Sequence, residues 1–333
     1  MASNVNRRDF LKLSAAALAG LAFRDFPPGE RRYQDRSSAY TLGRMVHSLR
    51  YYRLPSLESE ELGYYTADTV VKIIKETSGY SDVTRKTKWL QSEDGWFQGS
   101  YVQPVKNELN RPLTSVPASG MLVEVTVPYT QSYVVRDGEK KRSYRFYYKS
   151  THWVNNVIVG ENNLVWYQVL DERAKDYFYV EAAHLRPIMP EEISPISPGV
   201  SDKVIKVDLE KQRVTAFEGS RPVFTARTST GYFEGTTPIG EHRVERKQPS
   251  SHMTPFEGNR YDLPGVPWVC YISWSGVSLH GTYWHNNYGT PESSGCINLT
   301  PEDSLWFYRW TDPYVPPGED YVETDEGTQV VVV

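Results

Sequence analysis

A histidine and a cysteine sixteen residues apart are the two side chains of this sequence best suited to covalent chemistry. His280 stands in the tetrapeptide Leu-His-Gly-Thr, and Cys296 stands in the heptapeptide Ser-Ser-Gly-Cys-Ile-Asn-Leu. A thiol attacks as its thiolate, and a histidine is the usual base that removes its proton. A lone cysteine is more often a buried apolar residue, and a lone histidine more often a satisfied core residue. The two together, each beside a glycine, predict a nucleophile with its base.

The residues around this pair suit the other tasks of acyl transfer. Backbone N–H groups at Cys296, Gly295 and Ser294 are placed to hold a developing oxyanion, and glycine lets a substrate approach closely. Between base and nucleophile lies a segment that mixes aromatic faces with amides, which suits recognition of peptide or sugar. Side chains expected to contact substrate are Thr282, Trp284, Tyr288 and Asn298.

The motif His-Gly-Thr, followed by a loop and Ser-x-Gly-Cys-Ile-Asn-Leu, resembles the signature of the L,D-transpeptidases with a YkuD-type catalytic domain. The strand-like segment 204–209, the segments Thr-Ser-Thr-Gly (228–231) and Thr-Pro-Ile-Gly (237–240), and the C-terminal run 329–333 extend the resemblance. Many members carry a second histidine just before Gly-Cys, where this sequence has Ser294. The resemblance implies that the carbonyl of Gly281 orients the imidazole of His280.

The same resemblance implies a function in the bacterial cell wall. Family members cross-link peptidoglycan through a cysteine acyl-enzyme, with stem peptides as donor and acceptor, without a cofactor, and carbapenems are expected as covalent inhibitors. A carboxypeptidase or an enzyme that attaches proteins to the wall uses the same chemistry and stays open. A non-catalytic wall-binding protein also stays open, although the intact His280/Cys296 spacing argues against it. A papain-like protease fits less well, because its cysteine and histidine lie far apart in the opposite order.

The N-terminus predicts export. Arg7 and Arg8 precede the uncharged apolar run 13–23, which is about half the ~20 residues needed to span a bilayer. This pattern predicts a Tat-type signal in residues 1–25, a flexible leader in 26–40, and an extracytoplasmic protein of the cell wall or envelope. Cleavage of the signal and its retention as a membrane tether both stay open.

Charge and cysteine content exclude several classes of protein. The formal net charge is −4 and the basic residues are scattered, so no nucleic-acid footprint is expected. Two cysteines, Cys270 and Cys296, do not make a disulfide framework, and Cys270 is expected to be an apolar core residue. His280 and His285 are five residues apart, which is poor spacing for a shared zinc, and no metal site is expected.

The composition predicts a mainly β protein, because Tyr, Val, Thr and Trp recur and Gly and Pro punctuate the chain. A weak repeat, from Trp89 to Val105 and from Trp166 to Ile188, resembles bacterial Src-homology-3-like modules. It predicts two small β-barrels, at 41–110 and 115–188, which serve either as wall-binding modules or as spacers. A Pro/Ser-rich linker, crossed by few contacts, is expected at 189–200, followed by a β-sandwich with a short helix at 201–333.

Only two segments of the sequence have a helical pattern. They are 68–76 and 301–310, and the second has Thr300 as N-cap and Pro301 at its first position. Alternating apolar residues predict strands at 203–209, 213–218 and 223–229. His252 and Met253 are expected in a loop that covers the site, with His252 exposed to solvent.

Overall fold

The computed structural model describes residues 42–80, 86–160, 163–171, 173–254 and 261–333. All of these ranges belong to one compact unit, Tyr33–Val333. The expected signal and leader, 1–25 and 26–40, lie outside the described residues. Within the described ranges, no helix is long and apolar enough to cross a membrane.

The first N-terminal module is built from short antiparallel strands in two sheets, ordered β4-β1-β8 and β3-β2-β7-β6-β5. Its strands are β1 (Leu42–Met45), β2 (Leu49–Tyr52), β3 (Glu61–Tyr65), β4 (Val70–Lys72), β5 (Lys75–Tyr80), β6 (Lys86–Gln91), β7 (Trp96–Gln98) and β8 (Val102–Val105). The helix expected at 68–76 is wrong, because this segment forms β4 and the start of β5. Its run of β-branched residues (Thr69, Val70, Val71, Ile73, Ile74) fits a pleated strand better than a helix.

The second N-terminal module is one seven-stranded sheet in the order β11-β10-β14-β13-β12-β9-β15. Its strands are β9 (Met121–Val125), β10 (Tyr129–Arg136), β11 (Glu139–Tyr147), β12 (Thr151–Val159), β13 (Val165–Asp171), β14 (Asp176–Glu181) and β15 (Leu185–Pro187). The mainly β architecture is confirmed. The sheets of both modules are open, and the closed barrels expected from the sequence are not formed.

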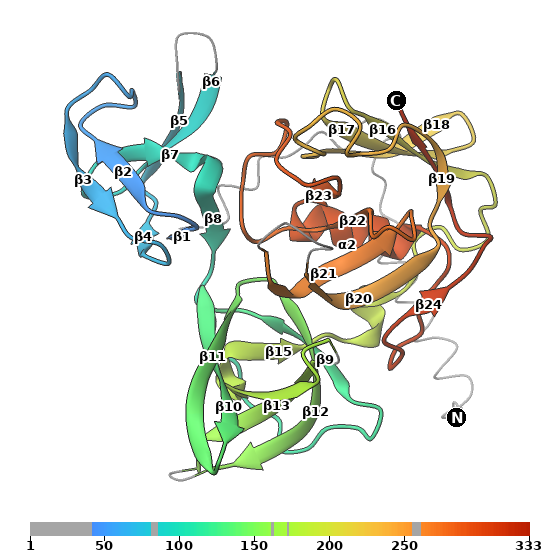
Figure 1. The fold of residues 1–333 in the computed structure, drawn as a ribbon, viewed down its shortest axis with the longest axis horizontal. Coiled ribbons are helices and arrows are strands. Elements are labelled where there is room, and N and C mark those ends of the chain that lie inside the picture. Colours follow the sequence, from blue (N-terminus) through green and yellow to red (C-terminus); the bar gives the residue numbers. More distant parts are fainter. Residues whose placement is uncertain (1–41, 81–85, 161–162, 172, 255–260) are drawn as a thin grey trace, which may run out of the picture. The chain divides into compact units, whose positions relative to one another are not determined.

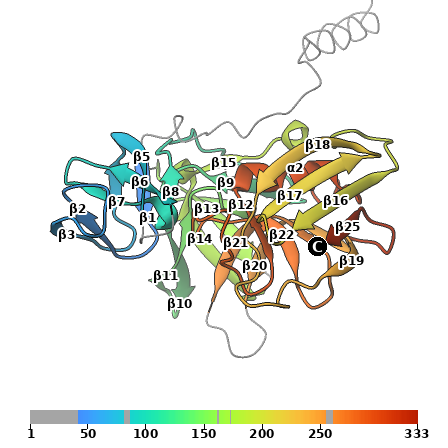
Figure 2. The same cartoon turned by 90° about the horizontal axis from the view of Figure 1, so that it is seen from above.

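The C-terminal region contains two five-stranded sheets and helix α2 (Pro301–Trp310). The first sheet has the order β18-β17-β16-β25-β19, with β16 (Lys203–Asp208), β17 (Arg213–Glu218), β18 (Arg221–Arg227), β19 (Gly240–Arg243) and β25 (Gln329–Val332). The second has the order β23-β22-β21-β20-β24, with β20 (Arg246–Met253), β21 (Leu263–Tyr271), β22 (Ser278–Gly281), β23 (Ile297–Leu299) and β24 (Val322–Glu323). Figures 1 and 2 show β16, β17 and β18 side by side, with α2 close to β22.

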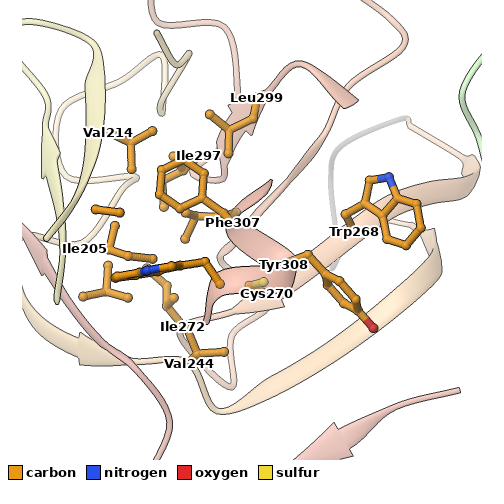
Figure 3. Close-up of a cluster of buried hydrophobic side chains, with 14 of the residues drawn as sticks. Ile205, Val214, Val244, Trp268, Cys270, Ile272, Ile297, Leu299, Phe307 and Tyr308 are labelled. Carbon is orange, nitrogen blue, oxygen red and sulfur yellow. The ribbon is translucent and has the colours of Figure 1, made fainter. Parts of the chain in front are cut away.

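Helix α2 lies in the main apolar core. The side chain of Thr300 accepts a hydrogen bond from the Asp303 N–H and Pro301 opens the helix, as the sequence predicts. Phe307 and Trp310 are fully buried. They share one cluster with apolar residues of both C-terminal sheets (Figure 3); this cluster includes Ile205, Val214, Leu279, Ile297 and Leu299. The helix therefore fixes the two strands on which His280 and Cys296 depend.

Apolar and polar contacts cross the expected boundary at 189–200. Leu122 and Ile188 of the second module, and Ile193 of the linker, join the core cluster around α2. The Ile196 N–H donates to the Arg309 carbonyl at 2.9 Å, and Arg309 Nε donates to the Ser194 carbonyl at 2.8 Å. The Pro/Ser-rich segment is therefore packed along α2.

Candidate active site

Two parallel strands place the histidine and the cysteine on one face of a sheet. β22 pairs with β23 in the register Leu279–Ile297 and His280–Asn298. Side chains alternate between the faces of a sheet, and paired residues point the same way. Leu279 and Ile297 point into the α2 core. His280 and Asn298 therefore point to the opposite face, which we call the site face, together with Ser278 and Cys296.

His280 is a buried, neutral imidazole whose tautomer is set by the carbonyl of Gly281. The side chain is 2 % exposed, and burial lowers the pKa of its imidazole to about 4. Its Nδ1 lies 3.1 Å from the carbonyl oxygen of Gly281. A carbonyl only accepts, so Nδ1 carries the hydrogen and Nε2 keeps the lone pair. At neutral pH Nε2 is therefore unprotonated and keeps its lone pair.

Cys296 is half-buried immediately before β23. Its Sγ lies 3.7 Å from the Ser278 hydroxyl and 3.7 Å from the Gly276 carbonyl. Burial raises the pKa of the Cys296 thiol, and hydrogen bonds from the hydroxyl and N–H of Ser278 act in the opposite direction. The resting site therefore holds a neutral thiol on the same face as a neutral imidazole.

The two glycines of the motif permit close backbone packing. A Cβ on Gly281 would lie 2.7 Å from both Pro267 and the Ser304 hydroxyl, so glycine lets α2 approach β22. Gly295 has a φ of +145°, and a Cβ there would lie 2.5 Å from the Thr236 carbonyl. The Gly295 N–H donates to the Ser293 hydroxyl at 3.0 Å. One of the expected oxyanion donors is therefore held by a neighbour, while Ser294 is exposed.

Asn298 is buried beside the base and is held by His285. Its amide nitrogen Nδ2 lies 2.9 Å from His285 Nε2, while His285 Nδ1 accepts from the Asn287 N–H at 3.2 Å. Burial lowers the pKa of His285 to about 3, so its imidazole is neutral and has only one accepting nitrogen. Because Nδ1 accepts, Nε2 carries a hydrogen, and exchanging the nitrogen and oxygen of the Asn298 amide turns this contact into a hydrogen bond.

This orientation leaves the NH₂ of Asn298 as the unpartnered half of the amide. Asn298 is 1 % exposed, and within the described residues the amide atom that faces away from His285 has no hydrogen-bond partner. A buried donor without a partner is costly unless a ligand supplies the acceptor. Both ring nitrogens of His285 are engaged, so the geometry favours His280 over His285 as the base.

The remaining predicted contact residues lie in the segment 282–292. Trp284 is partly exposed, and its ring centre lies 5.6 Å from that of His280. Tyr288 is 9 % exposed and its hydroxyl donates to the Leu299 carbonyl at 3.0 Å, so Tyr288 holds the segment against β23. Thr282 is buried, and its hydroxyl has no partner among the described residues. Among the aromatic side chains of this segment, Trp284 is the one that is partly exposed.

Arg44, which lies in the first module and which the sequence analysis did not single out, binds the segment 282–292. Arg44 on β1 is 2 % exposed, and its Nη2 donates to the Tyr283 carbonyl at 2.8 Å. Asp68 accepts from Nη1 at 2.6 Å. The Asn286 N–H donates to the Ser100 carbonyl at 2.7 Å. These partners are separated by up to 239 positions in sequence, so a local sequence pattern does not predict their contacts.

Two further residues lie apart from the pair. Cys270 is fully buried on the α2 side of the sheet, where burial raises the pKa of its thiol, and Figure 3 shows it among the core side chains. His252 lies on β20, with Nδ1 2.7 Å from Asp171, and its side chain is 6 % exposed. The expected solvent exposure of His252 is wrong, because Asp171 of the second module covers it. In the described residues, no group of three or more His, Cys, Asp or Glu is arranged to hold a metal ion.

One family model matches the region that contains this pair. Residues 202–332 match the model of the YkuD family, described as the L,D-transpeptidase catalytic domain. His280, Cys296 and Asn298 all lie inside the match. No curated protein matches the chain.

Among solved structures, an L,D-transpeptidase from Xylanimonas cellulosilytica is 23 % identical over 42 % of this chain, with a TM-score of 0.29. The match spans 64 % of that structure, less than two thirds of its length. An L,D-transpeptidase from Mycobacterium smegmatis is 18 % identical over 53 % of this chain and 93 % of its own, with a TM-score of 0.33. The catalytic domain of an E. faecium L,D-transpeptidase acylated by ertapenem is 25 % identical over 40 % of this chain and 98 % of its own, with a TM-score of 0.30. TM-scores below 0.5 do not by themselves assign a fold to the chain.

Proposed function

We propose that this chain, whose residues 202–332 match the model of the L,D-transpeptidase catalytic domain, is an exported enzyme that cross-links peptidoglycan stem peptides. The observation that carries the proposal is a neutral, buried His280, with Nε2 as its accepting nitrogen, on the same sheet face as Cys296. The twin arginines and the apolar run at the N-terminus support export.

In the first step, Nε2 of His280 takes the Cys296 proton as Sγ attacks a peptide carbonyl of the donor stem. The Cys296 N–H donates to the tetrahedral oxyanion. The NH₂ of Asn298 is available to donate to another carbonyl of the substrate. When the C–N bond breaks, the imidazolium returns the proton to the leaving amine. A thioester then joins the donor stem to Cys296.

In the second step, an amine of an acceptor stem attacks the thioester. His280 accepts a proton from that amine, the C–S bond breaks, and the sulfur recovers its proton from the imidazolium. A new amide bond then cross-links the two stems. Water in place of the amine gives a carboxypeptidase, and an amine on a protein gives attachment of that protein to the wall.

Incubation of the purified protein with a soluble stem peptide, followed by mass spectrometry, tests the proposal. We expect a cross-linked dimer and release of the donor's terminal amino acid, with neither formed by Cys296→Ala. A shortened peptide without any dimer would instead establish the carboxypeptidase. An unchanged peptide, with no thioester on Cys296, would contradict enzymatic function and favour a wall-binding protein.

A further inference from the structure

A row of side chains runs from Cys296 across the site face of the second C-terminal sheet. Sγ of Cys296 lies 3.7 Å from the Ser278 hydroxyl. Ser278 pairs with Tyr271 on β21, and Tyr271 pairs with Arg246 on β20. Directly paired residues of antiparallel strands point to the same face. Arg246 therefore shares the site face with Cys296, and its neighbour Lys247 points to the α2 core.

The length of this row matches a short extended peptide. Neighbouring strands are about 4.8 Å apart, so the three steps from β23 to β20 span about 14 Å. An extended chain advances about 3.4 Å per residue, so about four residues cover the same span. A peptide bound with one carbonyl at Cys296 therefore reaches Arg246 within its own length.

A cavity of about 580 Å³ lies at the far end of the row. Its lining includes Arg246, Gln248 and Tyr271 of the sheet, and Trp153 and Arg173 of the second module. This volume falls within the range of about 300–1,000 Å³ that is typical of small-ligand sites. The cavity is therefore large enough for the side chain or terminus of a peptide.

Two residues of the cavity lining each carry a polar side-chain atom without a partner among the described residues, and both atoms are donors. Within the described residues, Arg246 Nε and Trp153 Nε1 are buried without a hydrogen-bond partner. The guanidinium of Arg246 is held in place by the Tyr271 ring, whose centre lies 4.1 Å away. A buried donor left without an acceptor costs about 1–3 kcal/mol, so these two N–H groups favour a ligand that brings acceptor oxygens.

The carboxylates near the cavity do not supply that acceptor. Asp171 accepts from His252 at 2.7 Å and from the Ala174 N–H at 2.9 Å. Glu323 lies 3.8 Å from Arg246 Nη1, beyond hydrogen-bond distance, and its side chain is 44 % exposed. Asp320 is the other carboxylate of the lining. An exposed ion pair of this kind contributes little, which leaves Arg246 able to bind a carboxylate from a ligand.

We propose that this cavity binds a carboxylate of the donor stem peptide, with Arg246 as the residue that selects it and Trp153 as a second donor. The inference rests on the proposed function, because it takes Cys296 as the position of the attacked carbonyl. It adds a specificity site about four peptide residues from the chemistry. An acidic donor peptide is then preferred over the same peptide with its carboxylate converted to a carboxamide.

A cycle of two variants and two peptides tests the inference. Donor consumption is measured with the acidic stem peptide and with its carboxamide form, for the unaltered protein and for Arg246→Gln. A hydrogen bond to a charged group contributes about 1.5–3 kcal/mol, so we expect kcat/KM to favour the acidic peptide by about ten- to hundredfold. Arg246→Gln should remove this preference, and the loss should appear in KM.

Two controls keep the result specific. Arg213→Gln removes an exposed arginine from β17, and it should keep the full preference for the acidic peptide. Trp153→Phe removes one donor and keeps an aromatic ring, so it should weaken the preference without abolishing it, even if Arg246→Gln fails to fold. Equal use of both peptides by the unaltered protein, or an undiminished preference in Arg246→Gln or Trp153→Phe, would overturn the inference. If the unaltered protein shows neither carbapenem acylation nor peptide turnover, the proposed function would instead be refuted.

Discussion

The two faces of the sheet β23-β22-β21-β20-β24 each carry a cysteine and a basic residue, but these residues differ in burial and in hydrogen bonding. On the α2 face, Cys270 is fully buried, and Lys247 donates to the carbonyls of Tyr308 and Thr311 at 2.6 and 2.7 Å. On the site face, Cys296 is half-buried, and Arg246 Nε has no partner in the described part of the chain. Adjacent residues of one strand, Arg246 and Lys247, therefore differ in whether the fold itself satisfies them. Alternation along a strand separates a structural face from a face that is completed by a ligand.

The largest expected difference between the faces is between the two thiols. Cys296→Ser should lower peptide cross-linking by at least about a thousandfold, because a serine in this position is a far weaker nucleophile than the thiol. Cys270→Ser should keep most activity and lose about 1–3 kcal/mol of stability, since a hydroxyl replaces a thiol in the apolar core. The cross-linking assay and urea unfolding measure the two effects. Retained activity in Cys296→Ser, or lost activity in a folded Cys270→Ser, would break the comparison.

The next effect distinguishes the two buried histidines of the site face. His280→Ala should slow acylation of Cys296 by about 10²–10⁴-fold, because it removes the proposed general base. His285→Ala should slow it much less, because His285 acts by holding Asn298. Stopped-flow acylation by a chromogenic carbapenem measures both rates. A larger loss in His285→Ala than in His280→Ala would show that the base has been misassigned.

Substitutions of the neighbours Arg246 and Lys247 compare how much each face contributes to the stability of the fold. Burial lowers the pKa of Lys247 to about 8, and its two carbonyl partners lose their donor in Lys247→Met. We expect Lys247→Met to destabilise the fold by about 1–3 kcal/mol, and Arg246→Met to change stability by less than about 1 kcal/mol. Urea unfolding of both variants provides the measurement. A more stable Lys247→Met would mean that the core prefers an apolar side chain there.

The smallest expected effect is the response of acylation to pH. The pKa of His280 is lowered to about 4, so the base stays deprotonated above that value, while the pKa of the Cys296 thiol is raised. Proton transfer inside a neutral pair does not depend on pH between the two pKa values. The acylation rate should therefore change by less than about twofold from pH 5.5 to pH 7.5. A tenfold rise per pH unit would show that a free thiolate reacts without His280.

The features that the sequence predicted correctly depend on residues that are close together in the chain. The cap at Thr300, helix α2 and the first two strands of the C-terminal region depend on neighbours within a few residues, and the structure places them as predicted. The strand predicted at 223–229 forms two residues earlier, as β18. The helix predicted at 68–76 is wrong because apolar periodicity in a short run does not separate helix from strand, whereas the β-branched residues of this segment favour a strand. The open sheets of the modules also differ from the barrels that the weak repeat suggested.

The rest depends on residues far apart in sequence. The link from Arg44 to the Tyr283 carbonyl, the packing of Leu122 and Ile188 against α2, and the row from Cys296 to Arg246 arise only when the sheets are assembled. Glycines that look like substrate-access positions in the motif instead permit close backbone packing at Gly281 and Gly295. The sequence therefore predicted the reacting groups, and the fold was needed to show what surrounds them.

Mapping of a carbapenem adduct tests the central claim most directly. The purified protein is treated with a carbapenem, its intact mass is recorded, and its tryptic peptides are sequenced by mass spectrometry. We expect one adduct, on Cys296, which is absent from Cys296→Ser and present in Cys270→Ser. An adduct on Cys270, or an undiminished adduct in Cys296→Ser, would contradict the assignment of Cys296 as the nucleophile of the site face.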